Sequence, residues 1–100
     1  MIRGTTPKHT FTIPLDAENV AEVMIIYAQD DAEVFHKETK DCEMTGRTIS
    51  VTLSQEDTLL FDHTRNAQIQ LRLLTTEGVA LASHIIVLTV GKLLSDEVIY

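Results

Sequence analysis

Hydrophobic and polar residues alternate along much of the chain with the period of two that is typical of β-strands. The clearest example is the segment 47–54, in which Ile49, Val51 and Leu53 are separated by hydroxylated residues. The segment 68–75 repeats the pattern, with isoleucine and leucine on one face and glutamine and arginine on the other. Each segment is therefore predicted to be a strand with one buried and one exposed face.

A β-hairpin is predicted in the second half of the chain. The segment 76–78 ends in Gly78, which is free to adopt the positive φ that a tight turn needs. The run 79–90 that follows is rich in valine and isoleucine, which favour strands. We therefore expect 68–75 and 79–90 to pair as a hairpin.

The first half of the chain is predicted to be a further series of strands and turns. Pro14 either ends the first strand or confines it to the edge of a sheet, because proline cannot donate to the ladder. The second strand is nearly continuous in apolar residues, which indicates a central position with both faces covered. Residues 16–24 are also compatible with a helix start, but the β-branched run and Tyr27 favour a strand. The expected strands are 8–13, 20–29, 32–39 and 42–44, with turns at 30–31 and 45–46.

One short helical turn is predicted near residues 55–60. The Ser54 side chain is placed to accept a hydrogen bond from the Asp57 amide, and acidic residues are favoured in the first turn of a helix. Leu59, Leu60 and Phe61 then fall on the inner side. A turn of this kind carries the chain between opposite sheets in many β-sandwiches.

Together these elements predict an all-β fold, an antiparallel β-sandwich of immunoglobulin-like type with about six to seven strands. A small barrel is the alternative. Residues 1–100 form a single domain in this interpretation, with an N-terminal arm at 1–7 and a C-terminal tail at 92–100. The chain has one cysteine and no tryptophan, so the Cys–Trp–Cys core of antibody domains is absent and the likeness is architectural.

Composition narrows the classes of function. Fifteen acidic and eight basic residues leave a net charge of −7, which argues against binding the phosphate backbone of nucleic acid. The longest apolar run, 85–88, is far shorter than the roughly 18 residues of a membrane span, and the first residues lack the apolar core of a signal peptide. We expect a protein made in the cytoplasm, with no membrane and no nucleic-acid partner.

No catalytic, cofactor-binding or metal-binding residues are predicted. The chain has four histidines and one cysteine, but none lie at the spacing of a metal motif. Cys42 stands between Asp41 and Glu43, whose negative charges raise the pKa of a thiol and disfavour a reactive thiolate. The acidic turns lack the ligand pattern of a calcium loop, and no serine lies in a nucleophile motif. An enzyme is therefore the least favoured class.

The last eight residues combine large apolar side chains with two acids. A segment of this kind is expected either to fold back as an edge strand or to join the sheet of a neighbouring molecule through backbone hydrogen bonds. The predicted interface residues are Leu93, Leu94, Val98, Ile99 and Tyr100.

Several segments of the sequence resemble small uncharacterised proteins encoded in phages and prophages of Gram-positive bacteria. The resemblance is carried by residues 1–11, 51–58, 70–72 and 81–83, and it covers nearly the whole chain. It implies a component encoded among virion structural genes, with tail or baseplate parts as the nearest comparison. The family has no catalytic residues to transfer.

The leading hypothesis is a non-enzymatic structural or assembly protein that acts by protein–protein contact through sheet edges and termini. Its partners are other protein subunits, either further copies in a homo-oligomer or components of a virion. The alternative is a ligand-binding immunoglobulin-like module for a carbohydrate or a peptide. That alternative is weakened because only five residues are aromatic and the core needs at least two of them. A small metal-dependent enzyme is the third hypothesis.

Overall fold

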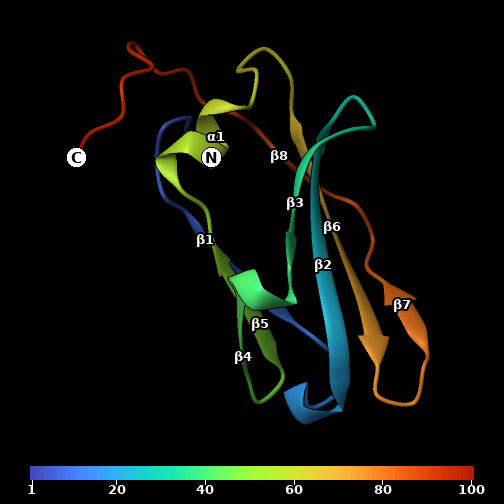
Figure 1. Cartoon of the computed structure of the whole chain (residues 1–100). Helices are drawn as coiled ribbons and strands as arrows, with labels where there is room; N and C mark the ends of the chain where they lie inside the picture. The colour runs from blue at the N-terminus through green and yellow to red at the C-terminus, as the bar shows by residue number, and fades with distance from the viewer.

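Strands dominate the structure, a computed structural model that describes residues 1–100 (Figure 1). They hold 48% of the residues and helices hold 11%, so the predicted mostly β fold is confirmed. None of the helices has the length and apolar composition needed to cross a membrane. The strands are β1 (Lys8–Thr12), β2 (Val20–Gln29), β3 (Ala32–Glu38), β4 (Cys42–Thr45), β5 (Thr48–Thr52), β6 (Ala67–Thr75), β7 (Ala80–Ala82) and β8 (Ile86–Leu88). The helical segments are η1 (Ala17–Asn19), η2 (Thr39–Asp41) and α1 (Gln55–Leu59).

The strands form two antiparallel sheets. One has the order β1-β5-β4 and the other β3-β2-β6-β7, with β8 also paired to β6. The short helix η2 carries the chain from β3 in the larger sheet to β4 in the smaller one. On the opposite side of the core, the edge strands β1 and β7 flank a groove between the sheets.

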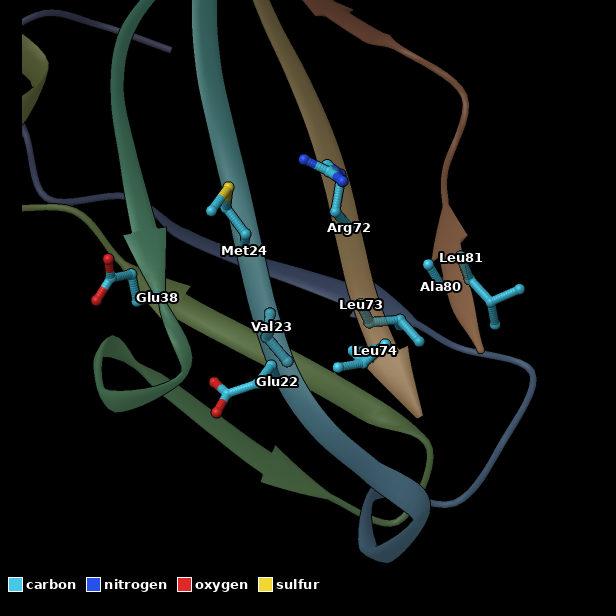
Figure 2. A pocket seen from close by; sticks show the side chains of 9 residues that line it. All are labelled: Glu22, Val23, Met24, Glu38, Arg72, Leu73, Leu74, Ala80 and Leu81. Carbon is cyan, nitrogen blue, oxygen red and sulfur yellow. The ribbon is translucent and has the colours of Figure 1, made fainter. Parts of the chain in front are cut away.

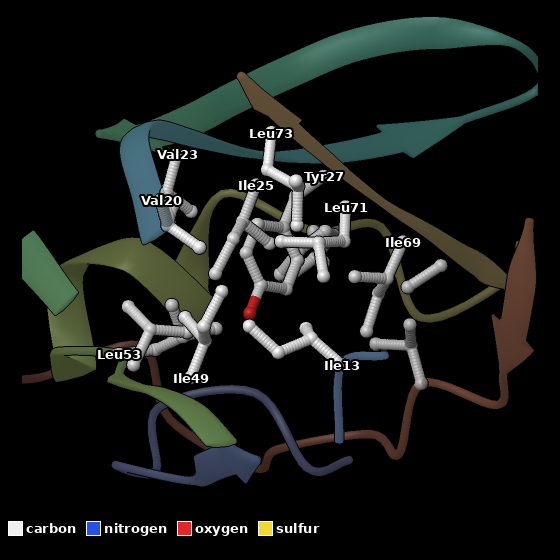
Figure 3. Packing of buried hydrophobic residues seen from close by; sticks show 14 residues of the cluster. Ile13, Val20, Val23, Ile25, Tyr27, Ile49, Leu53, Ile69, Leu71 and Leu73 are labelled. Atoms are coloured by element: carbon white, nitrogen blue, oxygen red, sulfur yellow. The ribbon is translucent and has the colours of Figure 1, made fainter. Parts of the chain in front are cut away.

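The hydrophobic core lies between the two sheets and uses the predicted alternation. Ile49, Val51 and Leu53 of the smaller sheet and its continuation are all 2% exposed or less. Figure 3 shows Ile49 pointing toward Ile25 of the larger sheet, whose apolar residues at 69, 71 and 73 are also buried. The predicted faces of 47–54 and 68–75 are therefore confirmed, because burying one face of each sheet requires this period.

Local signals also placed the short helix and the turn at 30–31 correctly, whereas the turn expected at 45–46 lies one residue later, because β4 includes Thr45. The Asp57 amide donates to Ser54 Oγ over 3.0 Å, and the Ser54 amide donates to Asp57 Oδ2 over 2.9 Å. This reciprocal pair satisfies free donors at the start of α1. Asp30 and Asp31 both have positive φ, as a two-residue hairpin turn requires. Before β2, the helix signal at 16–19 produces only the single turn η1, and the strand begins at Val20.

The segment 79–90 differs from the single strand of the predicted hairpin, because it is divided into β7 and β8. Leu73 pairs with Leu81 in β7, whereas Ile69 pairs with Ile86 in β8, so the register shifts by one residue between them. Ser83 lies at the shift. Its Oγ accepts the Leu71 amide hydrogen over 3.0 Å, in place of a backbone carbonyl. A serine that offers this local acceptor favours a break in the ladder over a continuous strand.

A buried glutamine at the end of β2 holds the loop that precedes β6. Gln29 is 2% exposed, and its Nε2 donates to the carbonyl oxygens of Asp62 and Arg65 over 2.8 and 3.0 Å. Its Oε1 accepts the Asp62 amide hydrogen over 2.9 Å. Because a buried amide is costly unless it is hydrogen-bonded, Gln29 couples the folding of this loop to the central strand.

Candidate interaction surface

A run of exposed apolar side chains follows the edge formed by β7 and β8. Monomeric proteins rarely leave such runs uncovered, and exposed apolar edges are common sites of strand pairing. The large apolar residues at this edge that are 40% exposed or more are Val79, Leu81, Ile85, Ile86 and Val87.

The edge is open because β7 and β8 have a strand neighbour on one side only. Both pair with β6, and no strand covers their other side. The outward residues of β7 are also small, since Ala82 pairs with Arg72 and Ala80 pairs with Leu74 on the outer face of the sheet. Backbone groups on the uncovered side are thus accessible to an added strand.

Two grooves border β7, one on each face of the sheet. The groove on the outer face, here called the outer groove, has a volume of about 500 Å³ (Figure 2). Its lining residues are Glu22, Val23, Met24, Glu38, Arg72, Leu73, Leu74, Ala80 and Leu81. The groove between the sheets, here called the side groove, has a volume of about 220 Å³. Its lining residues are Thr12, Ile13, Pro14, Leu71, Leu73, Leu81, Ala82 and Ser83.

An arginine without an ion pair lies in the outer groove. Arg72 is exposed and stands between Met24 and Ala82 in one row of paired residues. The other three arginines of the chain each lie 3.1 Å or less from an aspartate oxygen, whereas Arg72 forms no ion pair. The sequence placed Arg72 on the exposed face of its strand but carried no signal that its guanidinium lacks a carboxylate.

The acidic residues of the outer groove are already engaged on the β3 side. Glu22 Oε2 accepts the hydroxyl hydrogen of Thr39 over 2.7 Å. Glu38 Oε1 lies 3.4 Å from His36 Nε2, and its Oε2 lies 4.0 Å from Lys40 Nζ. Glu22 therefore has a hydroxyl donor and Glu38 has cationic neighbours on the β3 side, and neither carboxylate forms an ion pair with Arg72.

The predicted interface residues of the tail divide between packed and exposed positions. Leu93 and Val98 are half-buried. Leu93 packs on Gly4, where an added Cβ would come within 2.5 Å of the leucine side chain. In contrast, Leu94, Ile99 and Tyr100 are 97%, 80% and 108% exposed. The structure therefore brings two of the five onto the body of the protein and leaves three in solvent.

The tail is held by side chains and forms no strand after Gly91. Gln55 Nε2 donates to the Ile99 carbonyl over 2.7 Å, and Gln55 Oε1 accepts the Ile99 amide hydrogen over 2.9 Å. Arg3 forms an ion pair of 2.9 Å with Asp96. The expectation that the tail folds back as an edge strand of its own sheet is wrong, because the Ile99 backbone binds the Gln55 side chain and no strand.

The histidine nearest the core contacts the buried tyrosine. His9 Nδ1 and the Tyr27 hydroxyl lie 2.7 Å apart, and Tyr27 is fully buried between His9 and Phe35. Burial lowers the pKa of His9, and the positive chain terminus adds to the effect. Burial also raises the pKa of Tyr27 well above its ordinary value, assisted by Cys42 and Asp57. Both groups are therefore held neutral, as a structural hydrogen bond requires.

The remaining polar groups near Tyr27 form structural pairs. Lys37 Nζ lies 2.8 Å from Asp57 Oδ2, and although desolvation opposes it, the lysine and Ser54 bring the pKa of Asp57 below its ordinary value. The thiol of Cys42 donates to the Glu38 carbonyl, and burial followed by the charge of Asp41 raises its pKa. The sequence predicted the charge effect on Cys42 but not the larger effect of burial.

The histidines are placed on separate elements. His36 lies between two carboxylates, with Glu33 Oε2 3.0 Å from its Nδ1, and these hydrogen bonds, first that of Glu33, raise its pKa. No three histidine, cysteine or acidic side chains converge in a way that could hold a metal ion.

Comparison of the chain with models of protein families, with curated proteins and with solved structures finds no match. The function must therefore be inferred from the surface itself.

Proposed function

We propose that this protein is a non-enzymatic structural or assembly subunit that associates with further copies of itself through the β7 edge. The observation that carries the proposal is the uncovered run of apolar side chains along β7 and β8. Self-association through a sheet edge provides both backbone hydrogen bonds and apolar burial.

The two grooves beside β7 support strand addition in particular. Successive side chains of an added strand point to opposite faces of the sheet. One set of side chains would enter the outer groove and the other set the side groove. Both grooves share Leu73 of β6 and Leu81 of β7, so the same pair of strands borders both binding surfaces.

We also propose that the two sheets form an immunoglobulin-like sandwich. The supporting observation is strand order. The sheet β1-β5-β4 corresponds to strands B, E and D of that architecture, and β3-β2-β6-β7 corresponds to C′, C, F and G. In this correspondence the open edge is strand G, whose free side can accept a further strand.

The resemblance to phage and prophage proteins supports a specific setting for this subunit. Virion parts are built from repeated copies, so a small domain with an open sheet edge suits such an assembly. The proposal therefore includes a role in a phage particle, with the host cytoplasm as the place of synthesis.

The test is the mass of the protein in solution, measured by light scattering and sedimentation from about 1 μM to about 1 mM, where weak interfaces dissociate. The edge variant carries Val79→Lys and Leu81→Lys together, because edge lysines oppose strand pairing. The matched control is Leu60→Lys, since Leu60, contrary to the expected inner position, is 59% exposed and lies outside the edge. Circular dichroism verifies that each variant is folded.

We expect the wild-type protein and the Leu60→Lys control to exceed the monomer mass as concentration rises. We expect the edge variant to remain monomeric. A wild-type protein that is monomeric over the whole range would overturn the proposal, as would a folded edge variant that associates like the wild type.

A further inference from the structure

We propose that the outer groove binds residues 97–99 of a second copy of this chain, with Arg72 pairing to the carboxylate of Glu97. The inference rests on the proposed function, because it identifies which segment occupies the β7 edge. It also assigns a recognition role to a cation that has no partner within its own molecule.

The first argument is charge complementarity. The chain carries 15 acidic and eight basic residues, so a cation without an ion pair is unusual in it. Arg72 is such a cation, and it stands next to Met24 and Leu74 in a groove of mostly apolar residues, whose two glutamates have other partners. A guanidinium in this setting favours a partner with a carboxylate beside an apolar side chain.

The second argument is the composition of the tail. Glu97 is exposed and forms no ion pair, whereas the neighbouring Asp96 is taken by Arg3. Ile99 follows Glu97 by two residues and is 80% exposed. The segment therefore presents a carboxylate that forms no ion pair beside an exposed apolar side chain.

The third argument is spacing. In an extended segment, Glu97 and Ile99 point to the same face, about 7 Å apart. Arg72 and Leu74 have the same separation on the outer face of β6. Residues 97–99 also match β7 in length, since β7 consists of Ala80–Ala82. Val98 would then point to the opposite face, toward the apolar side groove.

The small side chains of β7 allow Arg72 to reach the docked segment. A strand added to β7 lies two strand spacings from β6, or about 10 Å. Between them stand only Ala82, beside Arg72, and Ala80, beside Leu74. Arginine and glutamate side chains together span this distance, whereas a large residue on β7 would block it.

The arrangement requires two molecules. The tail lies against the N-terminal arm and α1, at the opposite end of the molecule from β7 and the lower end of β6 (Figure 1). Docking exchanges the two hydrogen bonds between Gln55 and the Ile99 backbone for backbone bonds to β7. Each copy offers one tail and one groove, so the contact is head-to-tail and builds chains of subunits.

The test uses neutralising variants of the full chain. Arg72→Gln and Glu97→Gln each remove one partner of the ion pair, and each is expected to raise the dissociation constant of self-association about tenfold. Lys92→Gln is the matched control for Arg72→Gln, because Lys92 is the other cation without an ion pair and both substitutions lower the net charge by one. It is expected to associate like the wild type.

Charge exchange gives the sharper result. Arg72→Glu and Glu97→Arg are each expected to be largely monomeric alone, since each places like charges together. An equimolar mixture is expected to associate again, because every groove then meets a tail of opposite charge. Both positions are exposed, and circular dichroism verifies the fold.

The outcomes separate the two proposals. If the wild type associates, the edge variant does not, and the Arg72 and Glu97 variants behave like the wild type, the edge is the interface but the tail is not its occupant. A mixture of the exchanged variants that stays monomeric also overturns the inference. A monomeric wild type overturns the proposed function itself.

Discussion

The segments 20–29 and 79–90 are both dominated by apolar residues, yet their environments in the structure are opposite. Ile25 and Tyr27 of β2 are fully buried. Val79, which precedes β7, and Val87, which lies in β8, are more than half exposed. A central strand and an open edge thus come from segments of comparable hydrophobicity.

The difference lies in the neighbours that the fold supplies. β2 is paired with β3 on one side and β6 on the other, and its inner face meets the smaller sheet. β7 and β8 have only β6. Burial contributes about 25 cal/mol for each Å² of apolar surface removed from water, so the same residue types stabilise the monomer in β2 and remain available for association at the edge.

The largest expected effect comes from truncating one apolar residue in each segment. Ile25→Ala leaves a cavity in the core and is expected to lower the free energy of unfolding by about 2–5 kcal/mol. Val87→Ala, at a position 57% exposed, is expected to change it by less than about 0.5 kcal/mol. Urea denaturation followed by circular dichroism measures both values. Equal losses would contradict the comparison.

The next largest contrast in stability is expected between Gln29 at the end of β2 and Gln70, which contacts the edge segment from β6. Gln29→Ala removes three hydrogen bonds and leaves buried groups of the 62–65 loop without partners, which is expected to cost about 1–3 kcal/mol. Gln70 donates one bond to the Ser83 carbonyl at the edge, and Gln70→Ala is expected to cost at most about 1 kcal/mol. The same denaturation experiment compares them, and a larger loss for Gln70→Ala would reverse the assignment.

The register shift at the edge depends on one hydroxyl group. Ser83→Ala removes the acceptor of the Leu71 amide, with an expected cost of about 1 kcal/mol. Hydrogen exchange at the Leu71 amide is the direct measurement, and we expect it to become about fivefold faster. Ser50→Ala, which changes a hydroxyl pair with Thr10 in the other sheet, is the control. Unchanged exchange at Leu71 in Ser83→Ala would show that the hydroxyl is not required.

The smallest expected effects concern the pH dependence of stability, which is expected to be opposite for the half-buried His9 and the exposed His36. The folded state lowers the pKa of His9, so the unfolded chain binds the proton first and stability falls as the pH drops below about 6.5. The folded state raises the pKa of exposed His36, so its contribution is present below that pH and is lost as the pH rises through the raised pKa.

Denaturation midpoints from about pH 5.5 to about pH 8 test this pair, the range in which histidine titrates. His9→Gln is expected to remove a stability loss at the acid end. His36→Gln is expected to remove a stabilisation at the same end. His84→Gln, on the loop between β7 and β8, serves as the control. Changes of the same sign in both variants would show that these assignments are wrong.

The sequence by itself determined the features that depend on a few neighbouring residues. The alternation at 47–54 and 68–75 placed two core strands on their correct faces, and Ser54 with Asp57 placed the start of α1. Strand β2 begins and ends at the predicted residues, 20 and 29. These signals act through the pleat of a strand or the first turn of a helix, so they remain visible without the rest of the molecule.

The tertiary structure alone decided which of these elements are covered. The stacking of Tyr27 between His9 and Phe35, the loop bonds of Gln29 and the position of the tail all join residues far apart in the chain. The same applies to the candidate surface. Arg72 forms no ion pair because the two glutamates of its groove have other partners, and Leu81 is exposed because no strand covers the outer side of β7. Burial and ion pairing depend on which side chains from distant segments lie beside a residue. The local sequence pattern does not contain that information.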